Sequence, residues 1–293
     1  MKSDTAKGYL NGIAAAIGYG TNPLFALPLY ANGLGVNSVL LYRYLSATII
    51  YGLWLKLFKQ ISFKITFKEF LGLFLFAVIF AYSDIFIFEA FKYMDSGLAC
   101  TILFIYPLIV ALISKIIYKE NVSRVIWLAL VMVISGICLL YNGQEGLSIS
   151  LKGLIYVLLG AVSYAIYMVG IKHSKILKQT DNDKLVFYVM LFGLSVYMCN
   201  LRFFADLQPL NNWFCFLCIL GLAILPTIIS LETITRAIRY IGATRTAILG
   251  ALEPITALFF GVLLFNETIS LKILAGIILV IFGVTCVIRN NEA

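Results

Sequence analysis

Long apolar runs separated by short charged stretches organise this chain. Each run comes close to the roughly 20 apolar residues that a helix needs to cross a bilayer. No charge occurs from Gly8 to Tyr42, and the polar and glycine residues of 32–37 divide that long run with a turn. The pattern predicts ten helices, at residues 9–30, 37–57, 69–92, 96–117, 124–141, 153–171, 184–204, 212–235, 243–265 and 271–289.

The composition agrees with a chain that lies mostly in lipid. Of the 293 residues, 62% are hydrophobic and 12% are charged. A soluble domain has about 45–50% apolar and roughly 25% charged residues. These values exclude a soluble globular enzyme, a disordered protein and a nucleic-acid binder. We therefore expect an all-α membrane protein whose main surroundings are the lipid bilayer.

The positive charges predict the orientation of the helices. With the N-terminus in the cytoplasm, 17 Lys and Arg residues fall on inner segments and three, Lys92, Lys152 and Lys272, on outer ones. Arg43 and Arg202 fall within predicted helices. Because inner loops of membrane proteins are rich in Lys and Arg, both termini are expected in the cytoplasm. We expect a multi-pass protein of the cell inner membrane.

The chain also repeats itself. Residues 99–141, moved by 147 positions, overlay residues 246–288 without a gap. The matched residues include Pro107 with Pro254, Glu120 with Glu267, Ser123 with Ser270, and Gly136 with Gly283. The halves 1–146 and 147–293 then hold five helices each. Because five is odd, the second half enters the membrane with opposite polarity, which predicts two inverted five-helix repeats, a device of many transporters.

Charged side chains inside the predicted helices are candidates for function, because such groups are costly in a membrane. Arg43 and Asp84 have no local partner of opposite charge. They either pair with each other across two helices or face a polar cavity. A purely structural pair and contact with a substrate both remain open. Glu253 lies in the middle of a helix, and it is the candidate for proton coupling.

Two other acids have a simpler interpretation. Glu89 and Lys92 are three residues apart, and Glu232 and Arg236 are four residues apart. Residues at these spacings are neighbours on a helix surface, so we expect local ion pairs at the membrane interfaces.

Proline and glycine mark three expected helix breaks. Pro254 removes a helical hydrogen bond and should free the carbonyl of Gly250, and Pro107 occupies the equivalent place in the first half. Broken helices at corresponding places indicate a binding site. The candidate substrate-binding residues are Thr21, Asn22, Arg43, Tyr82, Asp84, Tyr106, Tyr167 and Glu253, and the candidate breaks are Pro23, Pro107 and Pro254.

Several kinds of chemistry are excluded by the residues present. His173 is the only histidine, so neither an HExxH zinc site nor a histidine-based catalytic triad can form. The sequence has no GxxxxGK[ST] phosphate loop and no potassium-channel filter motif. We expect no enzymatic activity, no cofactor and no metal.

At this point the sequence resembles the EamA-type transporters of the drug/metabolite transporter (DMT) superfamily. The residues that carry the resemblance are Arg43 in LYRYLSATII, and the segments YPLIVALISKIIYKE, ALEPITALFFGVLLFNETIS and GIILVIFGV. The resemblance covers essentially the whole chain. It implies ten helices in two inverted halves, a central cavity, and transport of small metabolites, often efflux of amino acids.

The sequence departs from that family in two ways. Tyr19–Gly20 stands where a Trp-Gly pair is often found, and Asp84, Glu89 and Glu232 are additional acids. These acids favour a cationic or zwitterionic substrate over an aromatic amino acid.

The resulting prediction is a secondary transporter that moves a small metabolite, such as an amino acid or a related zwitterion, by alternating access. The alternatives are an uptake or exchange carrier for a larger nucleotide-like metabolite, a lipid flippase, and a structural membrane subunit. A flippase would need a cavity open to lipid, and a structural subunit would leave Arg43 paired with Asp84 away from water.

Overall fold

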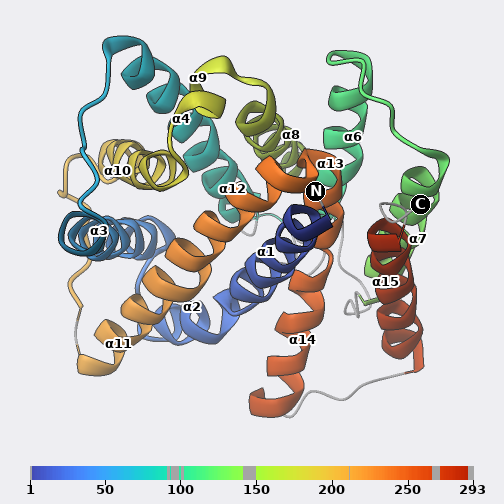
Figure 1. Cartoon of the computed structure of the whole chain (residues 1–293). Helices are drawn as coiled ribbons and strands as arrows, with labels where there is room; N and C mark the ends of the chain where they lie inside the picture. Colours follow the sequence, from blue (N-terminus) through green and yellow to red (C-terminus); the bar gives the residue numbers. More distant parts are fainter. Residues whose placement is uncertain are drawn as a thin grey trace.

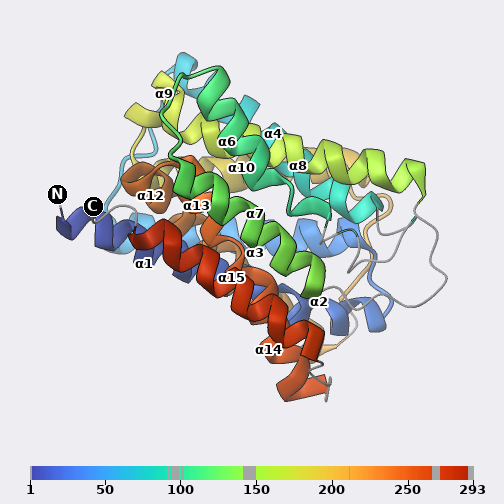
Figure 2. The same cartoon turned by 90° about the vertical axis from the view of Figure 1, so that its right-hand side faces the viewer.

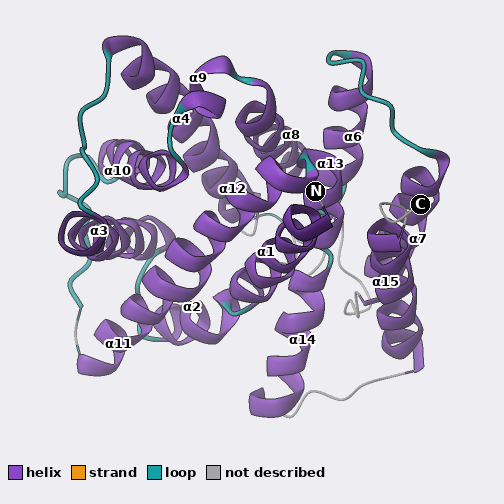
Figure 3. Ribbon diagram, viewed as in Figure 1, coloured by secondary structure: helices purple, strands orange, loops and turns teal. Residues whose placement is uncertain are grey.

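Helices make up every regular element that the structure, a computed structural model, describes (Figure 1, Figure 3). The described residues are 2–90, 93, 99, 102–140, 150–210, 212–265 and 271–289. The boundary predicted between the two halves, at residues 146 and 147, lies outside them, as do Lys92, Glu267 and Ser270.

The helices follow the predicted apolar runs. In the first half they are α1 (Lys2–Gly20), α2 (Asn22–Ala31), α3 (Val36–Trp54), the π-helical η1 (Leu55–Lys59), α4 (Phe67–Ala90), α6 (Tyr106–Ile116) and α7 (Arg124–Leu140). In the second half they are α8 (Leu151–His173), α9 (Lys175–Gln179), α10 (Asn182–Asn200), α11 (Trp213–Leu222), the π-helical η2 (Ala223–Ile229), α12 (Ser230–Ile241), α13 (Ala243–Leu249), α14 (Leu252–Phe265) and α15 (Leu271–Arg289).

Five helical segments among the described residues are long and apolar enough to cross a membrane. They are Val36–Lys59, Phe67–Ile87, Leu151–His173, Trp213–Ile241 and Leu271–Arg289. The other predicted spans consist of shorter helices or have polar ends, as α1 and α10 do. The sequence pattern predicts each of these interrupted helices as one span, with the expected breaks at Pro23, Pro107 and Pro254 inside the spans.

Three expectations about helix ends were wrong. The helix predicted to end at residue 235 continues to Ile241, so Arg236 and Arg239 lie within it. The first helix begins at Lys2 instead of residue 9, because its polar first turns are helical as well. Arg202 was placed inside a helix, but α10 ends at Asn200. Arg202, Phe203 and Phe204 have φ angles of 47°, 53° and 73°, so a left-handed turn ends the helix there.

The helices pack in pairs, and each of the main pairs takes one helix from each half of the chain. α1 packs along α12, and α4, the first-half counterpart of α12, packs along α8, the counterpart of α1. α7 packs on its own counterpart α15, and the two lie side by side in both views (Figure 1, Figure 2). α3 likewise packs on α10. The main hydrophobic core therefore takes side chains from both halves of the chain.

The helices are interrupted at each of the three expected prolines. Pro23 lies in the first turn of α2, after a turn at Thr21. Pro107 lies in the first turn of α6, and Pro254 is the third residue of α14, after a turn at Gly250 and Ala251. The carbonyl of Gly250 is not free as expected, because it accepts the N–H of Glu253 at 2.9 Å in a tighter turn.

Glycines at equivalent positions bring α7 and α15 together. A Cβ on Gly136 would lie 2.8 Å from the carbonyl oxygen of Gly276, and a Cβ on Gly283 would lie 2.8 Å from Cγ2 of Val133. Small residues of this kind let two membrane helices approach closely.

Gly136→Ala should therefore lower the stability of the protein, by about 1–3 kcal/mol, because the added methyl group overpacks a backbone contact. The measurement is the thermal unfolding midpoint of the purified protein in detergent. Gly193→Ala in α10 is the matched control, since its Cβ would meet no atom closer than 3.5 Å. Equal midpoints for the two variants would contradict the close contact at Gly136.

Candidate functional site

Polar side chains from several helices meet in the middle of the molecule. We call Tyr19, Arg43, Tyr44, Asp84, Tyr164, Tyr167, Tyr197, Thr227 and Glu253 the central cluster. The charges of Arg43, Asp84 and Glu253 act on one another and on Tyr19. Helices α1, α3, α4, α8, α10, η2 and α14 supply these residues, so both halves of the chain contribute.

Arg43 is the cation of the cluster, and its side chain is buried in α3. Its Nε donates to Oγ1 of Thr227 at 2.5 Å, and its Nη2 donates to the carbonyl oxygen of Pro226 at 3.1 Å. The guanidinium carbon also lies 5.7 Å from the centre of the Tyr44 ring. All these partners are neutral, so none of them compensates the positive charge.

Asp84 is the anion that faces the cluster from α4. One of its carboxylate oxygens accepts the hydroxyls of Tyr44 at 2.9 Å and Tyr197 at 3.2 Å. The two tyrosine rings are tilted against each other with centroids 5.0 Å apart. These donors stabilise the carboxylate and fix its orientation without adding a positive charge.

The direct ion pair of Arg43 with Asp84, one of the two arrangements expected from the sequence, does not form. Within the described residues each side chain has other hydrogen-bond partners, and the two interact only across a longer distance. The reason is that Thr227 and Tyr44 form hydrogen bonds with Arg43 and with Asp84, respectively.

Glu253 is the second acid of the cluster and lies in the first turn of α14. It is partly buried, and its carboxylate has neither a hydrogen bond nor an ion pair with the part of the chain that the structure describes. Gly20 packs directly on this turn, since a Cβ there would lie 2.7 Å from the carbonyl oxygen of Glu253. The end of α1 therefore contacts the first turn of α14.

Two tyrosine hydroxyls of the cluster are buried and have no partner among the described residues. Tyr167 is 1% exposed, and neither its hydroxyl nor that of Tyr19 has a hydrogen bond there. Buried polar groups normally have partners, so unpaired ones are places where a polar ligand or water can bind. Tyr106 differs, because its hydroxyl donates to the carbonyl oxygen of Ala247 at 3.2 Å.

Three predicted site residues have other surroundings. Thr21 is buried, but its hydroxyl donates to the carbonyl oxygen of Gly18 at 2.6 Å and so caps α1. Asn22 is partly buried at the start of α2. Tyr82 is 41% exposed and packs on Phe86, on a side of α4 away from Asp84. The structure therefore does not bring Tyr82 to the central cluster.

The sequence pattern did not indicate four residues that hold the charges of the site: Tyr44, Tyr197, Pro226 and Thr227. Pro226 lies in the π-helical part of the predicted helix 212–235, and Thr227 follows it as a fully buried polar residue. A proline next to a threonine within an apolar run was a visible signal. It was overlooked because the repeat places Ile79 opposite Pro226, so comparing the two halves does not reveal the break.

Cavities lie toward the predicted outer ends of the helices. One has a volume of about 410 Å³, and a second of about 280 Å³ shares Asn37, Glu89 and Asn200 with it. The first is also lined by Gly35, Val36, Ser38, Leu201, Asp206 and Gln208. Lys92, the expected partner of Glu89, lies outside the described residues.

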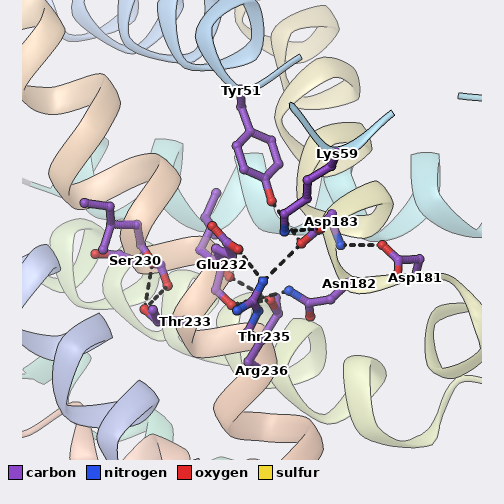
Figure 4. A network of polar contacts seen from close by, with 12 residues as sticks. Tyr51, Lys59, Asp181, Asn182, Asp183, Ser230, Glu232, Thr233, Thr235 and Arg236 are labelled. Carbon is purple, nitrogen blue, oxygen red and sulfur yellow. Dashed lines mark hydrogen bonds and ion pairs between the residues drawn. The ribbon is translucent and has the colours of Figure 1, made fainter. Parts of the chain in front are cut away.

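An ion-pair network closes the opposite, predicted inner ends of three helices (Figure 4). The carboxylate of Asp183 in α10 accepts Nζ of Lys59 at 2.5 Å and Nη2 of Arg236 at 3.2 Å. The same Nη2 lies 2.5 Å from Glu232, which confirms the expected pair, and the hydroxyl of Tyr51 donates to Asp183 at 3.4 Å. We call Tyr51, Lys59, Asp183, Glu232 and Arg236 the inner network.

A second cluster of polar side chains joins the segment that follows α6 to the C-terminal end of α8. Glu120 forms an ion pair with Lys172, and one of its carboxylate oxygens lies 3.1 Å from Nε2 of His173. The ring of Tyr118 stacks on the His173 ring with centroids 3.7 Å apart. These contacts tie the segment after α6 to the end of α8. Within the described ranges, no group of three or more His, Cys, Asp or Glu side chains is placed to hold a metal ion.

Comparisons with known proteins agree with this architecture. A solved crystal structure superposes with a TM-score of 0.82 at 16% sequence identity, covering 98% of this chain and 99% of the other, which shows the fold alone. The chain is 25% identical over 203 residues to the uncharacterized transporter YdfC of Bacillus subtilis (strain 168), covering 66% of this chain and 62% of that protein.

An uncharacterized transporter of Archaeoglobus fulgidus is 26% identical over 195 residues, covering 67% of this chain and 68% of the relative. The EamA-like transporter family matches residues 6–142 and again residues 151–289, which together are nearly the whole chain. The chain therefore belongs to the EamA-like transporter family, whose members are multi-pass membrane transporters of small molecules.

Proposed function

We propose that this protein is a secondary transporter that carries a small zwitterionic metabolite, such as an amino acid, across the inner membrane by alternating access. The observation that supports it most is the state of Arg43 and Asp84. They are opposite charges held by neutral partners instead of by each other. A molecule with a carboxylate and an ammonium group can bind to both at once through strong, charge-assisted hydrogen bonds.

The proposed architecture is ten membrane-spanning helices in two inverted five-helix repeats, residues 1–146 and 147–293, with both termini in the cytoplasm. Two family matches, one in each half, support it. The packing of α1 on α12 supports it as well, because their counterparts in the other half, α8 and α4, pack on each other in the same way. The start of α1 and the end of α15 lie at the same end of the molecule (Figure 2), as an even number of spans requires.

Alternating access is supported by the difference between the two ends of the helices. The predicted outer end has a cavity of about 410 Å³, whereas the predicted inner end is joined by the inner network. The residues that line this cavity belong to the outer ends of the helices and not to the central cluster, so a substrate that enters from outside must pass from the cavity to Arg43 and Asp84. The carrier must break contacts such as those of Asp183 to release the substrate inside, because interfaces of this kind switch between discrete states.

We further propose that Glu253 couples transport to protons. A coupling group must gain and lose a proton as the site is exposed to one face and then to the other. Glu253 is the acid of the cluster whose carboxylate has no hydrogen bond to the described residues, and the charges of Arg43 and Asp84 both act on it. Binding of a zwitterion between those two charges would therefore alter the field at Glu253.

The zwitterion proposal predicts which compounds stabilise the purified protein against heat. Amino acids should raise the melting temperature, because a ligand that binds only the folded state stabilises it. Their methyl esters, which lack the carboxylate, and the matching α-hydroxy acids, which lack the ammonium group, should need about 30-fold higher concentrations or more. The measurement is the concentration that gives half of the maximal shift in melting temperature.

Asp84→Asn is the informative variant for this test. The amide oxygen of asparagine can still accept the hydroxyls of Tyr44 and Tyr197, so the fold should persist while the negative charge is lost. Discrimination against α-hydroxy acids should then disappear, whereas Asp4→Asn, an exposed acid paired with Lys7, should change nothing. If hydroxy acids stabilise the unmodified protein as well as amino acids do, the zwitterion proposal is wrong.

A further inference from the structure

The π-helical segment η2 orients one hydroxyl group of the site. Pro226 has no N–H, so the carbonyl of Leu222 lacks the partner that a regular α-helix would supply four residues later, and in the π-helical turn its backbone partner is five residues later instead. The hydroxyl of Thr227 donates to this carbonyl oxygen at 2.8 Å. A hydroxyl has a single proton to donate. The lone pairs of Thr227 Oγ1 are therefore left to accept, and they accept from Nε of Arg43 at 2.5 Å.

These contacts occupy one edge of the Arg43 guanidinium. Nε and Nη2 lie on the same edge, and they donate to Thr227 and to the carbonyl oxygen of Pro226. A guanidinium has five N–H donors in a rigid, planar arrangement. The other edge, formed by Nη1 and the second N–H of Nη2, donates to no group in the described part of the chain. That edge has the spacing that binds a carboxylate through two parallel hydrogen bonds.

We propose that Thr227 is a positioning residue that determines selectivity for carboxylates, an inference that rests on the proposed transport of zwitterions. Its hydroxyl, oriented by the carbonyl of Leu222, holds one edge of Arg43 so that the other edge faces the carboxylate of the transported molecule. Thr227 is fully buried and does not touch that molecule itself. Pro226 is part of the same arrangement, because its missing N–H favours the π-helical turn that holds Thr227 next to the carbonyl of Leu222, and its own carbonyl is the second acceptor for Arg43.

Thr227→Val tests this role, because valine keeps the shape of threonine and removes the hydroxyl. The probes are an equimolar mixture of the standard amino acids and the same mixture as methyl esters, with half-maximal thermal stabilisation as the measurement. Valine should reduce the preference for free carboxylates over esters about tenfold or more, since a hydrogen bond to a charged group is lost. Thr227→Ser keeps the hydroxyl and should retain the preference.

Pro226→Ala is a second test, and it leaves Thr227 itself unchanged. Alanine supplies the N–H that regular α-helical pairing with the carbonyl of Leu222 needs, so the π-helical turn can relax and this variant should be at least as stable as the unmodified protein. The change of register should move the Thr227 hydroxyl away from Arg43, so the preference for carboxylates should fall as well.

The outcomes separate the two proposals. If the unmodified protein shows no preference for free carboxylates, the transport of zwitterions is wrong. If it shows the preference and Thr227→Val keeps it, the role of Thr227 is wrong and the proposed function stands. Equal losses in Thr227→Val and Thr227→Ser would assign the effect to packing of the side chain and would also overturn the role of the hydroxyl.

Discussion

Replacing Glu253 by glutamine should leave the protein folded and inserted, but abolish proton-driven accumulation of substrate. Glutamine has nearly the shape of glutamate, and among the described residues the interactions that depend on the charge at this position are electrostatic, with Arg43, Asp84 and nearby tyrosines. Removing an unpaired charge from a partly buried place should not lower stability. The variant can no longer carry a proton, so transport becomes independent of a pH gradient.

Proteoliposomes that contain a pH-sensitive dye measure this effect. An equimolar mixture of the standard amino acids is added outside, and acidification or alkalinisation of the interior reports protons that move with substrate. The unmodified protein should give a signal that Glu253→Gln lacks, while exchange of labelled amino acids across the membrane should continue. Loss of both activities would indicate that Glu253 is needed for substrate binding and not for coupling alone.

A matched control is available at the exposed end of α4. Glu69 accepts the backbone N–H of Thr66 at 2.7 Å and its hydroxyl at 2.9 Å, which is a capping arrangement that glutamine also satisfies. Glu69→Gln makes the same chemical change far from the central cluster and should leave proton movement intact. Equal proton signals from Glu253→Gln and the unmodified protein would contradict the proposal and direct attention to Asp84 and Glu89.

Asp183→Ala should open the predicted inner end of the site. Asp183 is 7% exposed, and it is the carboxylate that Lys59 and Arg236 share. The side chains of its partners are about one-third exposed, at 32% and 37%, so solvent weakens both pairs. We expect the closed inner end to lose about 1–3 kcal/mol of stabilisation, a value between those of exposed and of buried ion pairs. The population of inward-open molecules should rise about tenfold or more.

A cysteine at position 48 can report this opening. Thr48 is buried and lies on the same face of α3 as Tyr44 and Tyr51, between the central cluster and the inner network. Thr48→Cys is introduced after the six natural cysteines are replaced by alanine. Its labelling by a membrane-impermeant maleimide, applied from the cytoplasmic face of inside-out vesicles, should become about tenfold faster in Asp183→Ala.

The neighbouring acid Asp181 is the control for this variant. Its side chain caps α10 by accepting the N–H of Asp183 at 2.9 Å, and asparagine caps a helix equally well. Asp181→Asn therefore removes a negative charge two residues away without touching Lys59, and it should leave the labelling rate unchanged. Faster labelling in both variants would mean that net charge, and not the shared carboxylate, holds the inner end closed.

Local features of the sequence were sufficient to predict the helices. A membrane helix satisfies its own backbone hydrogen bonds, so a run of apolar residues is enough to place one. The pair of Glu232 with Arg236 could be predicted for the same reason, since residues four apart meet on any helix. Proline similarly indicated the interruptions before α6 and within the segment that holds α13 and α14.

The partners of the charged residues were decided by tertiary packing alone. Arg43 and Thr227 are 184 positions apart in the chain, and Lys59 and Asp183 are 124 apart. In lipid, apolar surfaces do not distinguish one helix neighbour from another, so close contacts at glycines such as Gly20 and Gly136 select which faces meet. The sequence by itself determined that Arg43 and Asp84 needed partners, and only the packed structure decided that these would be Thr227, Tyr44 and Tyr197 instead of each other, because those side chains lie on the helix faces that packing brings within reach.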